Sequence, residues 1–173
     1  MEADGILYRR FTMRLASSER ERLRELLKDC IESREALRMK KYVQHGTIST
    51  YDHCRNVVRV SYWLSRRLRI RVDERALARG AFLHDFYLYD WHDKDPSHRL
   101  HGFSHPGQAC ANARRYFKIG KKEAEIIRCH MWPLTLRHMP RSREALIVCA
   151  ADKYCSLLET FLGRGGKGVR ICG

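Results

Sequence analysis

The stretch TYDHCRNVVRVSYWLSRRL, residues 50–68, sets the pattern for the fold. Its apolar residues lie three or four positions apart, which is the spacing of one face of an α-helix: Val57, Val60, Leu64 and Leu68. His53 falls on the same face. The stretch therefore predicts an amphipathic helix that turns a histidine toward the protein interior.

Helical spacing continues on both sides of this stretch. Upstream, Ser18 and Glu21 have the spacing of a capping box, and the leucines that follow predict a surface helix over residues 18–40, with a break at Gly46. Downstream, Asp73 is a candidate N-cap for a helix whose inward positions end at His84.

The second half of the chain predicts one long loop and three further helices. Residues 86–104 are rich in Asp, His, Tyr and Trp and predict the loop, which is long enough to suggest a functional role. Pro106 suits the first turn of the next helix, and Gly120 suits its end. Two more helices are predicted over Lys121–Met131 and Ser142–Leu162. The second of these is apolar nearly all round, as a central buried helix is.

Strand-like alternation is nearly absent, so the predicted fold class is all-α, as a single compact helical bundle. With 173 residues the chain is long enough to bury a hydrophobic core of its own. We expect residues 1–45 to form a helical extension that packs on a core domain of residues 46–162. Residues 163–173, rich in glycine and basic residues, are expected to form a flexible tail.

The composition is that of a globular protein, with 44% hydrophobic and 31% charged residues. No apolar run is long enough to span a membrane, and residues 1–10 lack the apolar stretch of a secretory signal, so we expect a cytoplasmic protein. The formal net charge of +14 suits a nucleotide or nucleic-acid partner, although charge alone does not distinguish such a partner from simple solubility.

Seven cysteines are present, and no pair has the C-x-x-C spacing of a zinc or redox motif. We expect them to behave as small buried hydrophobic residues.

Six residues stand out by their position in the sequence: His53, His84, Asp85, His105, His130 and Asp152. Five of them fall within or at the start of predicted helices, and four of those share a face with apolar residues. A single histidine on an apolar face is more often a core residue satisfied by a hydrogen bond than a metal ligand. Asp152 is harder to explain in that way, because a buried carboxylate without a cation or donors costs several kcal/mol. A metal ion shared by these residues explains the whole set.

The donors in this set are imidazole and carboxylate groups. They exclude a thiolate zinc site and favour Mn, Fe, Ni, Co or Zn over Mg or Ca. Neighbouring residues on a helix diverge by about 100°. His84 and Asp85 therefore both reach a metal only if the helix ends there.

These motifs resemble the HD superfamily of metal-dependent phosphohydrolases. The resemblance is carried by YDHC around His53, by the doublet His84-Asp85 within AFLHDFYL, and by AADK around Asp152, in that order along residues of roughly 50 to 160. It implies a helical HD domain and a hydrolase that acts on phosphoesters, with a nucleotide as the expected substrate.

The segments HGFSHPGQA and IIRCH are similar to the additional histidine motifs of the binuclear branch of that family. The resemblance then implies a first metal bound by His53, His84, Asp85 and Asp152, and a second bound by Asp85, His105 and His130. His101 competes with His105 for this role, and the Pro-Gly that follows favours His105. The chain departs from the HD-GYP type, since Phe86 and Tyr87 follow the doublet, which argues against a cyclic dinucleotide substrate.

Further residues are candidates for roles beside those of the metal ligands. Besides Asp85, the candidate catalytic residues are Asp52, which could orient a ligand or take up a proton, and Lys153, which could bind a phosphate. For Lys153, a solvated lysine at a helix edge is an equally good interpretation. Arg55 could neutralise substrate charge, and the acidic and histidine residues of the 86–104 loop are expected to shape the mouth of a pocket.

Three alternatives to a hydrolase remain open at this point. The same fold with two irons hosts oxygenases in the HD family, and the basic charge would also suit a nucleic-acid binding module with a non-catalytic HD site. A structural metal site is the third, although nothing in the sequence suggests closed tetrahedral coordination.

Overall fold

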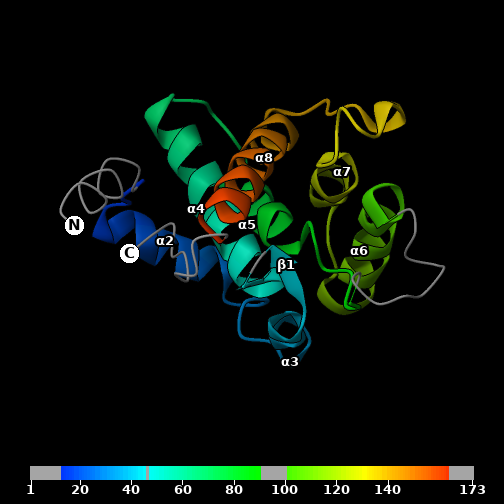
Figure 1. The fold of residues 1–173 in the computed structure, drawn as a ribbon. Coiled ribbons are helices and arrows are strands. Elements are labelled where there is room, and N and C mark those ends of the chain that lie inside the picture. Colours follow the sequence, from blue (N-terminus) through cyan, green and yellow to red (C-terminus); the bar gives the residue numbers. More distant parts are fainter. Residues whose placement is uncertain (1–12, 46, 91–100, 164–173) are drawn as a thin grey trace.

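Helices make up nearly all of the regular structure in the computed structural model, which describes residues 13–45, 47–90 and 101–163 (Figure 1). The all-α fold class is confirmed. The elements are α2 (Ser17–Leu27), α3 (Arg34–Leu37), η1 (Arg38–Lys41), β1 (Val43–His45), β2 (Ile48–Ser49), α4 (Thr50–Arg67), α5 (Glu74–Leu83), α6 (His101–Phe117), α7 (Lys121–Cys129), η3 (Leu136–His138) and α8 (Arg143–Gly163).

Helices α4, α5 and α8 form the centre of the molecule, where α4 packs against both of the others (Figure 1). The predicted helix starts are confirmed for two of them. The Ser49 hydroxyl accepts a hydrogen bond from the backbone N–H of Asp52 at the start of α4, and the Asp73 carboxylate accepts one from Ala76 at the start of α5. Helix α7 packs against α5 and α8, and α6 packs against α7.

The N-terminal region is not the single helix expected over residues 18–40. Helix α2 ends at Leu27, and the chain turns before Ser33 caps a new helix by accepting a hydrogen bond from the backbone N–H of Ala36. A serine hydroxyl that accepts a hydrogen bond from a backbone N–H favours the start of a new helix over the continuation of the helix before it, which explains the break. Buried residues of α2, among them Leu23, belong to the same hydrophobic core as α4 and α5.

A short antiparallel hairpin, which the sequence analysis did not predict, lies between η1 and α4. Strand β1 pairs with β2, with Val43 opposite Ser49. Such short strands leave no alternating pattern to detect. The hairpin matters because its Gln44 side chain is buried against the centre of the fold.

Helix α6 differs from its predicted form at both ends. It begins at His101, so that Pro106 lies inside the helix and not in its first turn. Proline removes only the bond to the carbonyl of Gly102, which is a small loss so close to the start. Helix α6 ends at Phe117, and Gly120 is the N-cap of α7. Residues 91–100 of the expected loop and 164–173 of the expected tail lie outside the described residues.

Six of the cysteines are described, and all six are buried, as expected: Cys30, Cys54, Cys110, Cys129, Cys149 and Cys155. In the described part of the chain, no helix combines the length and the apolar character that a membrane span requires.

Candidate metal centre

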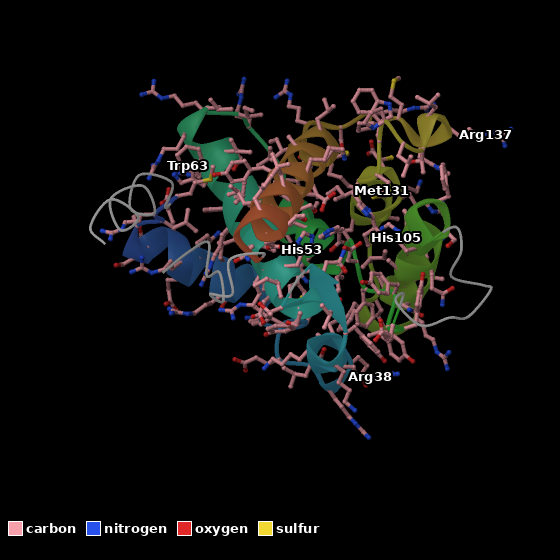
Figure 2. All side chains as sticks on the ribbon, in the orientation of Figure 1. Arg38, His53, Trp63, His105, Met131 and Arg137 are labelled. Carbon is pink, nitrogen blue, oxygen red and sulfur yellow. The ribbon has the colours of Figure 1, made fainter. Side chains whose placement is uncertain are left out.

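Helices α4 to α8 bring all six predicted ligands into one buried cluster. His53 lies in the first turn of α4 and Asp152 in the middle of α8, while His105 lies early in α6. His84 and His130 are the C-caps of α5 and α7, so each of these helices ends at a buried histidine. Figure 2 shows His53 and His105 in the interior of the molecule. Each of the six residues is at most 7% exposed.

Asp85 lies between two groups of histidines. Its Oδ2 atom lies 3.4 Å from His84 Nε2 and 3.9 Å from His53 Nε2. Its Oδ1 atom lies 3.1 Å from His105 Nε2 and 3.4 Å from His130 Nε2. The ligand atoms of His53, His84 and Asp85 all lie within 4.8 Å of one another, and so do those of Asp85, His105 and His130.

Asp152 completes the first of these groups. Its Oδ1 atom lies 3.2 Å from His53 Nε2 and 3.5 Å from His84 Nε2. Four side chains from α4, α8 and the end of α5 therefore converge at this side of Asp85. The second group contains Asp85, His105 and His130, and there the Nε2 atoms of the two histidines are only 2.8 Å apart.

Hydrogen bonds to the other ring nitrogen fix the orientation of three imidazoles. The Nδ1 of His84 donates to the carbonyl of Ala81 at 2.7 Å, and that of His130 donates to the carbonyl of Ile127 at 2.8 Å. The Nδ1 of His53 donates to a carboxylate oxygen of Glu159 at 2.7 Å. In the neutral form each of these rings therefore turns the lone pair of Nε2 toward Asp85.

Two buried polar atoms at the middle of the cluster have no hydrogen-bond partner among the described residues: His84 Nε2 and Asp85 Oδ1. Both belong to predicted ligands. A buried acceptor without a partner costs free energy that a bound cation would recover. The residues therefore fit a divalent metal ion in donor type, in burial and in the direction of their lone pairs.

The histidines and carboxylates of the cluster shift one another's pKa values. Burial lowers the pKa of His53, but hydrogen bonds to Asp152 and Glu159 outweigh it and raise the pKa to about 10. Burial would raise the pKa of Asp85, yet His84, His105 and His130 hold it well below its ordinary value. Burial would also raise the pKa of Asp152, but His53 and His84 lower it and keep this carboxylate ionised. A protein without metal thus keeps these carboxylates charged beside protonated imidazole, and a metal ion would replace those protons.

Comparison with known families agrees with this geometry, since residues 50–157 match the HD domain family. The chain belongs to the HD domain family. Comparisons with curated proteins and with solved structures gave no match.

Glu159 is a residue of this HD domain that the sequence analysis missed. Its side chain is fully buried in α8, where Oε2 accepts from His53 Nδ1 and Oε1 accepts from the Asn56 amide at 2.9 Å. It lies two helical turns after Asp152 and therefore on the same face of α8. A glutamate on the same helix face as Asp152, in a largely apolar helix, was the available signal.

Gln44 is the second residue that was missed. Its amide Nε2 donates to Asp85 Oδ2 at 2.7 Å, and its Oε1 accepts from the hydroxyl groups of Tyr87 and Thr50. The hairpin thus places a donor on the carboxylate that separates the two histidine groups. Nothing in the pattern around residue 44 indicated this contact.

The structure gives the two other candidate catalytic residues different positions. Asp52 is exposed at the start of α4, where its carboxylate accepts from the Ser49 hydroxyl at 2.8 Å, so its position does not support a role in the reaction. Lys153 lines the pocket beside the cluster, and its ammonium donates to the carbonyl of His130 at 2.8 Å. His101 begins α6, and its side chain lies outside the described part of the structure.

The cluster opens into a cavity of about 620 Å³. Asp85, His105, His130 and Asp152 contribute to its lining, so four of the six candidate ligands are accessible from it. The size is that of a small-molecule binding site.

Proposed function

We propose that this HD domain protein hydrolyses a phosphoester, with a nucleotide as substrate, by means of a metal-activated water. The observation that carries the proposal is the position of Asp85, whose two oxygen atoms face two separate pairs of histidines in a buried cluster that opens into a cavity. A carboxylate in this position suits a bridge between two cations.

In this proposal, His53, His84, Asp85 and Asp152 hold one divalent ion, and Asp85, His105 and His130 hold a second. The donor set suits Mn, Fe, Ni, Co or Zn. Such ions supply Lewis acidity toward a phosphoryl oxygen and a bound water of lowered pKa.

The chain itself supplies position and charge. Gln44 and Glu159 fix the orientation of Asp85 and His53 through hydrogen bonds, so the ligands need little rearrangement to bind an ion. Lys153 brings a cation to the cavity and is our candidate for contacting a phosphoryl oxygen. No protein nucleophile is required.

A nucleotide is the proposed substrate because the chain carries a net charge of +14, which favours encounter with phosphate-rich molecules. The same charge leaves the end of a nucleic acid as a related substrate.

The test is a panel of phosphoesters given to protein purified without chelator and supplied with manganese. We expect turnover of at least one nucleotide, and loss of that turnover in Asp85→Asn. Asp52→Asn, which changes an exposed aspartate next to a ligand, is expected to retain turnover. Oxygen consumption by iron-loaded protein, without hydrolysis of any ester, would contradict the proposal and favour an oxygenase.

A further inference from the structure

The cavity at the cluster has two chemically different sides. One is polar and consists of the four candidate ligands that line the cavity together with Gln44, Lys153 and Ser156. The other consists of apolar side chains from the segment that follows α7, namely Met131, Pro133 and Leu134, with Gly102 of α6 beside them. We call these four residues the apolar wall. Figure 2 shows Met131 beside α7, on the same side of the molecule as His105.

The apolar wall is exposed although nothing in the proposed hydrolysis uses it. Leu134 is 49% exposed, and it lines the cavity together with Met131 and Pro133, so its exposure is part of a shared apolar surface. An apolar surface that adjoins a reactive centre is typical of the part of a pocket that holds the non-reacting portion of a ligand.

The side chains of Met131 and Leu134 lie close to the start of α6. A Cβ atom at Gly102 would lie 3.2 Å from Leu134 Cδ2 and 3.8 Å from Met131 Cε. A turn in the segment itself, in which the backbone N–H of Leu134 donates to the carbonyl of Met131 at 2.8 Å, fixes the two side chains relative to each other. Because residue 102 has no side chain, Met131 and Leu134 can pack directly against the backbone at the start of α6.

The position of the wall limits the ligand. Met131 directly follows the candidate ligand His130 and lines the same cavity as it, so the apolar group that Met131 contacts belongs to the same small ligand as the reacting phosphate. Three side chains make a short wall, which suits a flat ring system better than a long alkyl chain. Methionine sulfur also makes favourable contacts with aromatic rings.

We propose that the apolar wall binds the base of a nucleoside phosphate whose phosphate lies at the metal centre. This inference rests on the proposed function and names the part of the site that selects the leaving group. It assigns specificity to Leu134 and Met131, which contact the base and take no part in bond cleavage.

The test compares AMP with ribose 5-phosphate, which is the same ester without the base. We expect kcat/KM for AMP to exceed that for ribose 5-phosphate by about tenfold or more, which corresponds to one favourable apolar contact of about 1.4 kcal/mol. Leu134→Ala should reduce this ratio severalfold, and Gly102→Ala should reduce it as well because it displaces Leu134. Leu146→Ala, on a leucine of α8 that is 50% exposed and does not line the cavity, should leave the ratio unchanged.

Equilibrium binding of adenosine provides a readout that does not depend on turnover. Adenosine should bind to the wild-type protein and bind more weakly to Leu134→Ala. If no ester is hydrolysed but this binding difference is found, the proposed function fails and the base site stands. If AMP and ribose 5-phosphate are hydrolysed equally well, or if hexyl phosphate matches AMP, the base site is overturned and the hydrolase stands.

Discussion

At the scale of single residues, His53 lies between two carboxylates of the same helix. Asp152 faces its Nε2 at 3.2 Å, and Glu159 accepts from its Nδ1 at 2.7 Å. A metal ion bound by Nε2 would displace the proton there, and Glu159 would keep the remaining proton on Nδ1 and so hold the tautomer that can bind metal.

Glu159→Gln should therefore weaken metal binding at the first site by about 10- to 100-fold, as loss of a partner of a ligating histidine does. Isothermal titration with manganese measures the change, and circular dichroism verifies that the variant is folded. The matched control is Glu32→Gln, which makes the same substitution at an exposed glutamate outside the cluster. An unchanged affinity in Glu159→Gln would show that His53 does not depend on this carboxylate.

All six clustered residues were predicted from the sequence. Four of them lie on apolar helix faces, where a histidine or aspartate conflicts with burial unless it has a partner, and the resemblance to the HD family completed the set. Gln44 and Glu159 were not found. Gln44 reaches Asp85 from a hairpin too short to leave a pattern, and Glu159 contacts a ligand and not the proposed metal. Asp52 was expected to orient a ligand or take up a proton, but it directly precedes His53 on a helix and therefore lies on another, exposed face of α4.

At the scale of elements, α5 and α7 approach each other closely at Gly80. A Cβ atom there would lie 2.6 Å from Ile126 Cδ1. This contact sets the distance between the two helices that end in His84 and His130.

Gly80→Ala should lower the free energy of unfolding by about 1–3 kcal/mol, since overpacking outweighs the better helix propensity of alanine. Chemical denaturation measures the loss, and Ile126→Ala combined with Gly80→Ala should cost less than the sum of the two. Gly107→Ala on α6, where no atom lies within 4 Å of the added Cβ, is the control and should not destabilise. A Gly80→Ala protein as stable as wild type would contradict the close approach.

A buried carboxylate connects the starts of two helices. Glu144 of α8 accepts from the backbone N–H of Asp73 at 2.6 Å and from the Lys122 ammonium at 3.2 Å. Burial raises the pKa of Glu144, but these hydrogen bonds outweigh it and hold the pKa below the ordinary value of 4.5. Because the folded pKa is the lower one, its stabilisation is present above pH 4.5 and is lost as the pH falls through the folded pKa.

Glu144→Gln should therefore be less stable than wild type at pH 7, by about 1–2 kcal/mol, and the difference should shrink as the pH falls below 4.5. Thermal unfolding over a range of pH measures it. The exposed Glu21→Gln serves as a control and should give no such pH-dependent difference. A difference that persists unchanged at low pH would rule out the ionised carboxylate as its cause.

The prediction was accurate where the spacing of apolar residues and the residue at the helix start indicate the same helix, as in α4 and α5. The errors occurred where a local cap decided the outcome. Ser33 begins a new helix where the leucine pattern suggested one continuous helix, and the start of α6 was placed too late because proline was given too much weight. Short-range competition of this kind is not visible in the periodicity of apolar residues.

At the scale of the whole molecule, the candidate metal centre is a property of the assembled fold. Its six side chains come from α4, α6 and α8 and from the ends of α5 and α7, and no single element carries more than the His84-Asp85 doublet. Folding therefore brings together like and unlike charges that a metal ion would hold in place. A metal that binds only the folded state stabilises it by mass action.

The central claim is that these side chains hold two ions with Asp85 shared between them. The most direct test is the metal content per chain after loading with manganese and removal of excess. We predict two ions for wild type, one for His105→Ala, and fewer than one for Asp85→Asn. Full metal content and unchanged turnover in both His53→Ala and Asp152→Ala would contradict the account.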